Sequence, residues 1–312
     1  MNVKSKRAAS SSTRLLIARS QWLTNLALAI RTTRGRVGLG LTGFVVLVAA
    51  IGPFVALHSP TALMSVPFSK PSSSFPFGTD ILGRDVLSRI LTGGWILLIM
   101  ACIATFFGVF VGAAAGVSAA YLRGKSDNII MRSADVILAF PQIVFALLLV
   151  SVVGPKLWLI VFAVGFTHVP AVARVIRSAA LDVTERDFVK AAELVGVSPN
   201  HLMMREILPN LVTPLMVETG LRLTYSIGII AGLGFLGFGQ APPAPNWGLM
   251  ISENLLGAQS NPWAVIAPTV MIALLAIGTN TFTDAIARVA IGVERPLGEA
   301  ELMDGVASEE VP

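Results

Sequence analysis

The chain has 312 residues, of which 54% are hydrophobic and 13% are charged, with a formal net charge of +5. Soluble domains carry about 25% charged residues, so this composition excludes a water-soluble domain and predicts an all-α, multi-pass protein of the plasma or inner membrane. The single cysteine, Cys102, excludes a disulfide within the chain. We attribute the basic excess to membrane topology and to membrane lipid, and expect no nucleic-acid partner.

The N-terminal segment, residues 1–37, contains eight Lys or Arg and no acid, and is predicted to be cytoplasmic. Its apolar residues fall near one helical face, which predicts an interfacial helix on the inner leaflet. A disordered basic tail stays open as an alternative for residues 1–12. The apolar residues of the predicted helix are Leu15, Leu16, Trp22, Leu23, Leu26 and Ile30.

Six segments contain the roughly 20 apolar residues needed to cross about 30 Å of hydrocarbon. With both termini in the cytoplasm, 18 of the 23 basic residues lie inside and four lie outside. Cytoplasmic loops are rich in Lys and Arg, so the topology is predicted to be N-in and C-in. The predicted transmembrane helices cover residues 38–57, 94–120, 130–153, 157–176, 211–237 and 264–287.

The predicted extracytoplasmic segment, residues 58–93, ends in FGTDILGRDVLSR. Asp80, Arg84, Asp85 and Arg89 alternate in sign there, with acid–base pairs four residues apart on an expected helix. One interpretation is a solvated, self-paired cap above the membrane. The other is a docking surface for an external protein.

Residues 94–290 form a predicted core of five transmembrane helices. Gly108, Gly112 and Gly116 leave one face of the second predicted span without side chains, which indicates close packing against another helix. Pro141 interrupts the third predicted span, where proline usually kinks a transmembrane helix. The acidic residues 291–312 are interpreted as a C-terminal tail.

A polar, charged segment, residues 188–210, which we call the polar island, overlaps the second half of the predicted cytoplasmic loop 177–209. It predicts a helix over residues 188–195, a break at Gly196, a turn at Ser198-Pro199 and a second helix ending near Leu208-Pro209. Such a segment is expected to form a rigid projection on the cytoplasmic side that another protein can contact. Ala191 and Ala192 permit close approach by another protein.

Ionisable residues inside predicted spans are candidates for function. Glu218 and Arg222 are four residues apart in the favourable acid-first order, so they form either a structural pair or part of a path for a polar or zwitterionic substrate. His168 is either a helix-interface residue or a proton site. Asp135 and Asp284 lie near cytoplasmic ends and are expected to pair with Arg132 or Arg288.

The chain has no GxxxxGK[ST] string, so it lacks a P-loop of its own. Two GxGxxG strings, at 38–43 and 232–237, lie in predicted spans and not between a strand and a helix, which excludes a dinucleotide loop. HExxH, CxxC and GxSG strings do not occur. We therefore predict no catalytic residues, no metal site, no bound cofactor and no enzymatic activity in this chain.

From about Arg34 to Pro296 the chain resembles the C-type permease subunit of dipeptide, oligopeptide and nickel ABC importers. The island resembles the "EAA" loop of such permeases, in which Ala-Ala is followed by Gly and then by Leu-Pro, with Lys190 here in place of the usual Glu. Ile230, where relatives often carry Glu, and residues 292–295 also depart from the pattern. Further matching strings lie at residues 77–89, 135–141, 173–177, 207–210, 235–239, 245–248 and 261–263.

The resemblance implies a type I ABC importer permease that imports di- or oligopeptides. Implied partners are a second homologous permease, two ABC ATPase subunits that bind ATP and Mg²⁺, and an extracytoplasmic substrate-binding protein. The ATPase-coupling residues would be Lys190, Ala191, Ala192, Gly196, Leu208 and Pro209, and the binding protein would dock at Asp80, Arg84, Asp85 and Arg89.

Alternatives remain at this point. An ion-coupled secondary transporter of a small polar solute would use Glu218, His168 or Asp284, but it needs inverted repeats and has no need of a docking loop. A passive scaffold or channel subunit is a third class. Dipeptides, longer peptides, glutathione-like compounds, haem and nickel all remain open as substrates.

Overall fold

The computed structural model describes residue 24 and residues 26–292. Most of the predicted interfacial helix, and the predicted acidic tail from residue 293 onward, lie outside the described residues. The described part is helical and contains no strand, which confirms the all-α class. Its α-helices are α2 Thr33–Val55, α3 Val86–Gly93, α4 Trp95–Leu122, α5 Gly124–Leu138, α6 Gln142–Val153, α7 Leu157–Thr184, α8 Asp187–Leu194, α9 Pro199–Leu202, α10 Val212–Phe235, α11 Trp247–Asn254 and α12 Trp263–Ala290.

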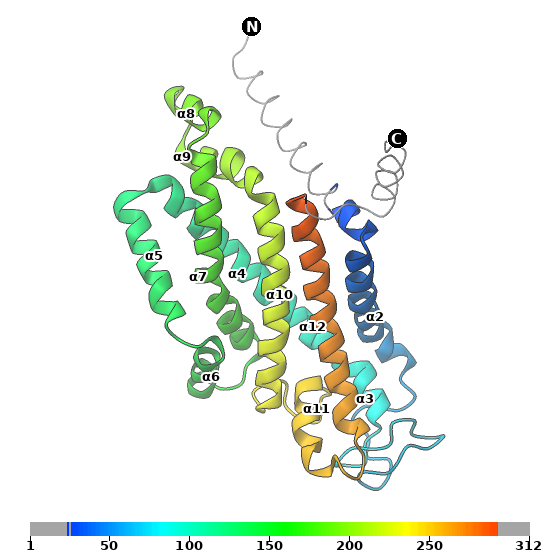
Figure 1. The fold of residues 1–312 in the computed structure, drawn as a ribbon. Coiled ribbons are helices and arrows are strands. Elements are labelled where there is room, and N and C mark those ends of the chain that lie inside the picture. The colour runs from blue at the N-terminus through cyan, green and yellow to red at the C-terminus, as the bar shows by residue number, and fades with distance from the viewer. Residues whose placement is uncertain (1–23, 25, 293–312) are drawn as a thin grey trace, which may run out of the picture.

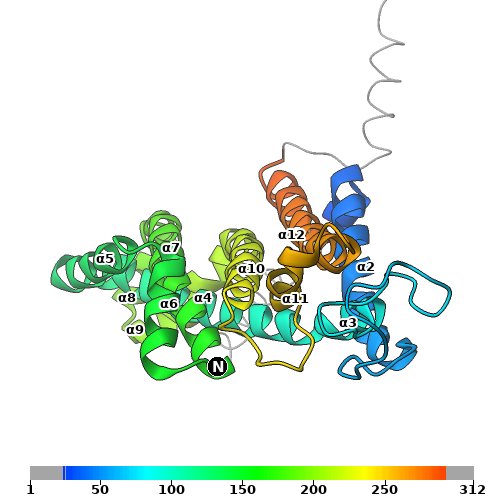
Figure 2. The ribbon, with the colours of Figure 1, turned by 90° about the horizontal axis from the view of Figure 1, so that it is seen from below.

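The long helices form one bundle with short elements at each end (Figure 1). α4 packs along α7, α10 contacts α4, α7 and α12, and α2 packs on the opposite side of α12. Seen from below, α5 and α2 lie at opposite edges of a broad row (Figure 2). The short helices α8 and α9 project from one end, while α3 and α11 lie at the other.

Four described helices are long and apolar enough to cross a membrane, and the bent pair α5–α6 raises the number to five. The fifth predicted span, residues 211–237, corresponds to α10, which is not among them because Glu218 and Arg222 interrupt its apolar stretch. Its 24 residues span about 36 Å, which suffices to cross a bilayer. The prediction of six spans therefore depends on α10.

The third predicted span is two helices, and the expectation of one kinked helix was wrong. α5 ends at Leu138, α6 begins at Gln142, and the two axes differ by 81°. Proline lacks an N–H and disfavours helical geometry in the residue before it. Pro141 occupies the N-cap of α6, so the break falls where both effects coincide.

The glycines of α4 allow it to touch the backbone of α7. A Cβ built on Gly108 would lie 2.7 Å from the carbonyl oxygen of Gly165 and from His168 Cβ, and one on Gly116 would lie 2.6 Å from the carbonyl oxygen of Ala173. Real Cβ atoms do not approach so closely, so these positions require glycine. The predicted close packing is confirmed.

Residues 26–31 are helical and lead into α2, whose N-cap Thr32 accepts a hydrogen bond from the Gly35 N–H at 3.0 Å. Leu26 and Ala29 pack against Ala285 and Ile286 near the end of α12. The end of the N-terminal segment is therefore packed on the cytoplasmic side of the bundle.

Candidate transport and coupling sites

The polar island folds largely as the sequence predicts. α8 ends at Leu194, Gly196 adopts a left-handed conformation with φ of +78°, and Pro199 begins α9. The second helix then continues through a π turn, Met203–Ile207, and a 3-10 turn, Leu208–Leu211, directly into α10. The predicted end at Leu208-Pro209 is therefore a change of helix type, and the part of the island from Pro199 onward leads into α10 without an intervening loop.

The island is anchored on one face and exposed on the other. Val189 is buried in a cluster with Ile207 and Leu211. Leu194 and Val195 are 89% and 61% exposed at the tip of the projection. Two exposed apolar residues on a rigid, charged projection are suited to contact with a protein partner.

Lys190 is paired within its own chain. Its Nζ lies 3.2 Å from Glu185 Oε2, and Arg123 Nη2 contacts Glu185 Oε1. Hydrogen bonds from Arg123 and from Lys190 hold the pKa of Glu185 below its ordinary value. The positive charge at position 190 therefore sits in a local charge cluster that joins α8 to the end of α4.

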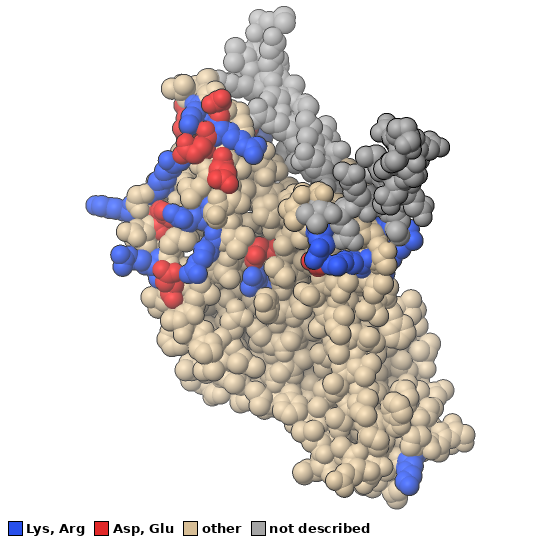
Figure 3. Space-filling view, viewed as in Figure 1, with Lys and Arg blue, Asp and Glu red and all other residues tan. Residues whose placement is uncertain are grey.

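The cytoplasmic charges form a belt. Charged side chains gather over the upper part of the face in Figure 3, and the lower part is nearly free of them. Asp135 pairs with Arg174 at 2.6 Å, whereas Arg132 was the expected partner. Asp284 pairs with Arg288 at 2.9 Å, as expected. Asp284 also accepts a hydrogen bond from Arg34 at 2.9 Å.

At the opposite end, Asp80, Arg84 and Arg89 are buried, and both arginines pair with the partly exposed Glu253, which was not identified from the sequence. Arg84 Nε donates to Asp80 Oδ2 at 2.6 Å, and Arg84 Nη2 donates to Glu253 Oε2 at 2.9 Å. Arg89 lies 3.2 Å from Asp80 and 3.2 Å from Glu253. This external ion network joins the segment before α3 to α11.

Asp85 has a different role in the same region. It caps α3, accepting hydrogen bonds from the Ser88 N–H at 3.1 Å and from the Ser88 hydroxyl at 2.6 Å. His58 Nδ1 lies 3.2 Å from the same carboxylate oxygen. The helix thus begins after Asp85, whereas a helix that includes Asp80 and Arg84 was expected from the spacing of the charges.

The cap is self-paired as one interpretation held, but the expectation that it is solvated was wrong. The exposed fractions of Asp80, Arg84, Asp85 and Arg89 are 0–1%. Asp80 pairs with both arginines, whereas Asp85 is held by Ser88 and His58. These four side chains do not present their charges to a partner in this structure. They fix the shape of the surface above them.

Glu218 and Arg222 form the predicted pair within α10. Arg222 Nε donates to Glu218 Oε2 at 3.0 Å, and the guanidinium lies over the Tyr225 ring at 5.2 Å from its centroid. The exposed fractions of the two charged side chains are 6% and 11%.

His168 is completely buried at the junction of three helices. Its Nε2 lies 2.9 Å from Ser226 Oγ, which lies 3.0 Å from Thr105 Oγ1. This chain of polar atoms links α7, α10 and α4. Ser226 and Thr105 were not identified from the sequence, since their partners are 58 and 121 residues away.

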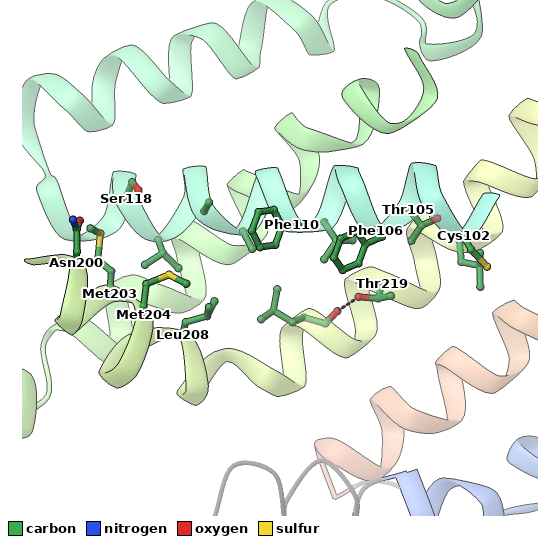
Figure 4. Close-up of a pocket in the computed structure, with 16 residues that line it drawn as sticks. Cys102, Thr105, Phe106, Phe110, Ser118, Asn200, Met203, Met204, Leu208 and Thr219 are labelled. Carbon is green, nitrogen blue, oxygen red and sulfur yellow. Dashed lines mark hydrogen bonds between the residues drawn. The ribbon is translucent and has the colours of Figure 1, made fainter. Parts of the chain in front are cut away.

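An apolar cavity of about 750 Å³ lies between α4 and α10 and extends to the π turn (Figure 4). Thr105 and Phe106 line one end, and Met203, Met204 and Leu208 line the other. Glu218, Arg222 and His168 are not among its lining residues. The cavity therefore extends from the middle of the bundle to α9 and the π turn of the polar island, and Glu218, Arg222 and His168 do not line it.

Residues 108–290 match the family described as "Binding-protein-dependent transport system inner membrane component". A putative peptide transport system permease protein of Brucella suis is 33% identical over 252 residues, covering 80% of this chain and 85% of the relative. The dipeptide transport system permease protein DppC of Alkalihalophilus pseudofirmus is also 33% identical, over 253 residues, covering 80% and 83%. The glutathione transport system permease protein GsiD of Escherichia coli O6:K15:H31 is 36% identical over 216 residues, covering 69% and 71%.

The bundle also resembles a solved structure. A chain of the inward-facing MetNI methionine ABC transporter superposes with a TM-score of 0.50 at 20% identity, covering 65% of this chain and 95% of that chain. At this identity the likeness shows the fold alone, and the shared fold is that of an ABC importer permease.

Proposed function

Since the chain belongs to the family of binding-protein-dependent transport system inner membrane components, we propose that it forms part of the translocation path of an ATP-driven importer of di- or oligopeptides. It is a multi-pass membrane permease of an ABC transporter, a class in which ATPase activity lies in separate subunits. The relatives carry peptide, dipeptide and glutathione transport names. Peptides are the substrate class that these names share, and they do not favour the ion-coupled alternative.

The exposed tip of α8 carries the proposed coupling role. Leu194 and Val195 face solvent beside Gly196, and nothing in the described chain lies within 4 Å of a Cβ built on Gly196. We propose that an ATPase subunit covers this surface, with Lys190, Ala191, Ala192 and Gly196 in the contact. Leu208 and Pro209 connect the contact to α10.

The uninterrupted helical run from α9 to α10 supplies a route for movement. When two ATPase subunits close around ATP and Mg²⁺, a displacement at α8 passes through the short break at Gly196 to α9 and from there along the chain to α10. The permease needs only two arrangements of its helices, whose balance the ATPases shift between inward-open and outward-open. A second homologous permease completes the path, and this chain binds no cofactor itself.

Glu218 and Arg222 are the proposed polar groups of the path, with His168 behind them. A peptide has a terminal ammonium and a terminal carboxylate, which complement Glu218 and Arg222 in charge. Their low exposure means that a peptide reaches them only after α10 has moved. The apolar cavity beside α10 accommodates side chains of the peptide.

An external binding protein is the proposed source of substrate. The external ion network holds the two external segments as one unit, and a binding protein would contact the exposed surface of that unit. Asp80, Arg84, Asp85 and Arg89 serve this docking by positioning the surface from below.

Substitutions at Gly196 test the coupling assignment. Asn tolerates a positive φ, so Gly196→Asn adds bulk with little strain, whereas Gly196→Leu adds bulk and the roughly 1–2 kcal/mol of a left-handed residue. Both variants are expected to fold, to lose peptide-stimulated ATP hydrolysis and to lose peptide uptake in proteoliposomes that contain the complete transporter. Normal uptake by both would refute docking at this position.

Substrate class is tested in the same proteoliposomes. Uptake of a labelled dipeptide and a labelled tetrapeptide is compared with uptake of glutathione and of Ni²⁺, each with the cognate binding protein. We expect ATP-dependent accumulation of at least one peptide. Accumulation that follows a proton gradient without ATP would instead restore the ion-coupled alternative.

A further inference from the structure

A second cavity, of about 430 Å³, lies where the predicted cytoplasmic ends of α2, α10 and α12 meet. Arg34, Asn280, Thr281 and Asp284 supply its polar lining, and Leu221 and Ala287 are among its apolar residues. It is separate from the cavity beside α4 and from the coupling segment.

The charges at and beside this cavity do not cancel. Arg34 and Asp284 line the cavity, and the carboxylate of Asp284 is shared by Arg34 Nη1 and by Nε of Arg288, which lies beside the cavity, each at 2.9 Å. Together, two guanidinium groups and one carboxylate leave one positive charge in excess. Each guanidinium has five N–H donors, so both retain donors that are free to bind a further anion.

Asn280 places a polar side chain farther from the predicted cytoplasmic end of α12 than Asp284. It lies ten residues before the end of α12, or about 15 Å along the helix, and its side chain is exposed. Among the described residues neither its amide nor the Thr281 hydroxyl has a hydrogen-bond partner. A polar amide at this depth favours a ligand that supplies hydrogen-bond acceptors.

The lining residues change from charged to polar to apolar along the cavity, which matches the arrangement of groups in an amphipathic ligand. The Arg34 guanidinium lies at the end nearest the predicted cytoplasmic side with Arg288 beside it, an amide and a hydroxyl follow, and Leu221 and Ala287 contribute apolar wall. Basic pockets between transmembrane helices on the cytoplasmic side suit anionic lipid head groups. We propose that this cavity binds an anionic phospholipid of the inner leaflet, with its phosphate at Arg34 and Arg288 and an ester carbonyl at Asn280.

The test measures phosphatidylglycerol bound to the delipidated transporter containing the full chain, by native mass spectrometry. One cation near an anionic lipid surface contributes about 1 kcal/mol, so Arg34→Gln is expected to weaken binding about fivefold. Arg36→Gln removes the same charge from the same helix outside the cavity and is the matched control. It is expected to bind as the wild type does.

A second variant tests whether the volume of the cavity matters, independently of its charge and of protein stability. Ala287→Trp keeps every charge but narrows the cavity, and is expected to lower phosphatidylglycerol binding while the melting temperature in detergent stays near that of the wild type. Arg34→Lys keeps a cation and is expected to retain most of the binding. Phosphatidylcholine, which has no net charge, is expected to bind more weakly than phosphatidylglycerol.

Four results would overturn the proposal. Equal loss in Arg34→Gln and Arg36→Gln would mean diffuse attraction to basic residues. Unchanged binding in Ala287→Trp would place the lipid elsewhere, or would mean that a partner subunit covers the cavity. Equal binding of phosphatidylcholine would exclude recognition of an anion. Displacement by glycerol phosphate at lipid concentrations would identify a site for small anions that does not require acyl chains.

Discussion

Lys190 Nζ lies 3.2 Å from Glu185 Oε2, so the residue that replaces an expected acid of the coupling loop is held by an acid of its own chain. The charge inversion is therefore compensated locally, and the proposed ATPase partner would meet an ion pair at this position.

Lys190→Glu is expected to weaken coupling. The new carboxylate would lie beside Glu185, and like charges at this distance repel. Peptide-stimulated ATP hydrolysis by the complete transporter is expected to fall several-fold, with little change in melting temperature because both side chains are more than half exposed. Lys190→Gln is the neutral control, and Lys190→Glu with Glu185→Gln should recover activity. Equal activity of the Glu and Gln variants would contradict this explanation.

The Glu185 cluster predicts a pH dependence. Arg123, and then Lys190, hold the pKa of this carboxyl below its ordinary value of 4.5. A depressed folded-state pKa means that the cluster stabilises the protein above pH 4.5 and that this contribution disappears as the pH falls through the lower value. Because Glu185 is more than half exposed, the melting temperatures of wild type and Glu185→Gln should differ only slightly at neutral pH, and this difference should vanish in acid. A difference that persists in acid would show that the substitution acts through something other than charge.

Gly108→Ala is expected to destabilise the bundle by about 1–3 kcal/mol, because the added methyl group overpacks the contact between α4 and α7. Gly43→Ala is the matched control, since a Cβ at Gly43 in α2 would meet nothing within 4 Å. Alanine is favoured over glycine in helices by roughly 0.5–1 kcal/mol, so the control should be as stable as the wild type or more so. Unfolding in detergent measures both, and equal stability of the two variants would refute the tight contact.

Arg84→Met is expected to be the most damaging of these changes. It leaves Asp80 without its closest cation in a buried site, and removing one partner of a buried pair costs about 3–5 kcal/mol. Lys70→Gln removes an exposed cation from the same segment and should have little effect. Unfolding measurements and limited proteolysis of residues 58–93 follow the two variants, and equal protection from proteolysis would mean that the network contributes no rigidity.

Local patterns in the sequence predicted local structure well. The break at Gly196 and the helix start at Pro199 follow from residues whose backbone preferences are strong. The pairing of Glu218 with Arg222 and of Asp284 with Arg288 follows from four-residue spacing on one helix. The glycine stripe at Gly108 carried enough information to predict a contact, though not to identify α7 as the neighbour.

Contacts between distant segments were not predictable in the same way. Glu253 lies 169 residues from Arg84, and no spacing rule connects them. The alternation of charges from Asp80 to Arg89 suggested exposure, because buried charges are rare unless their partners are known. The 81° bend at Pro141 exceeds an ordinary proline kink, and its size depends on where α5 packs against α7.

The members of the external ion network become available at different times while the chain is being synthesised. Asp80 and Arg84 leave the ribosome almost together, but Glu253, the partner of Arg89, is synthesised 164 residues after Arg89. At about 5–20 residues per second, that interval is on the order of ten seconds or more. During it, two arginines share one aspartate on the far side of the membrane. The external ion network is therefore complete only when the loop that contains Glu253 has crossed the membrane, and α12 then follows to pack against α2 and α10.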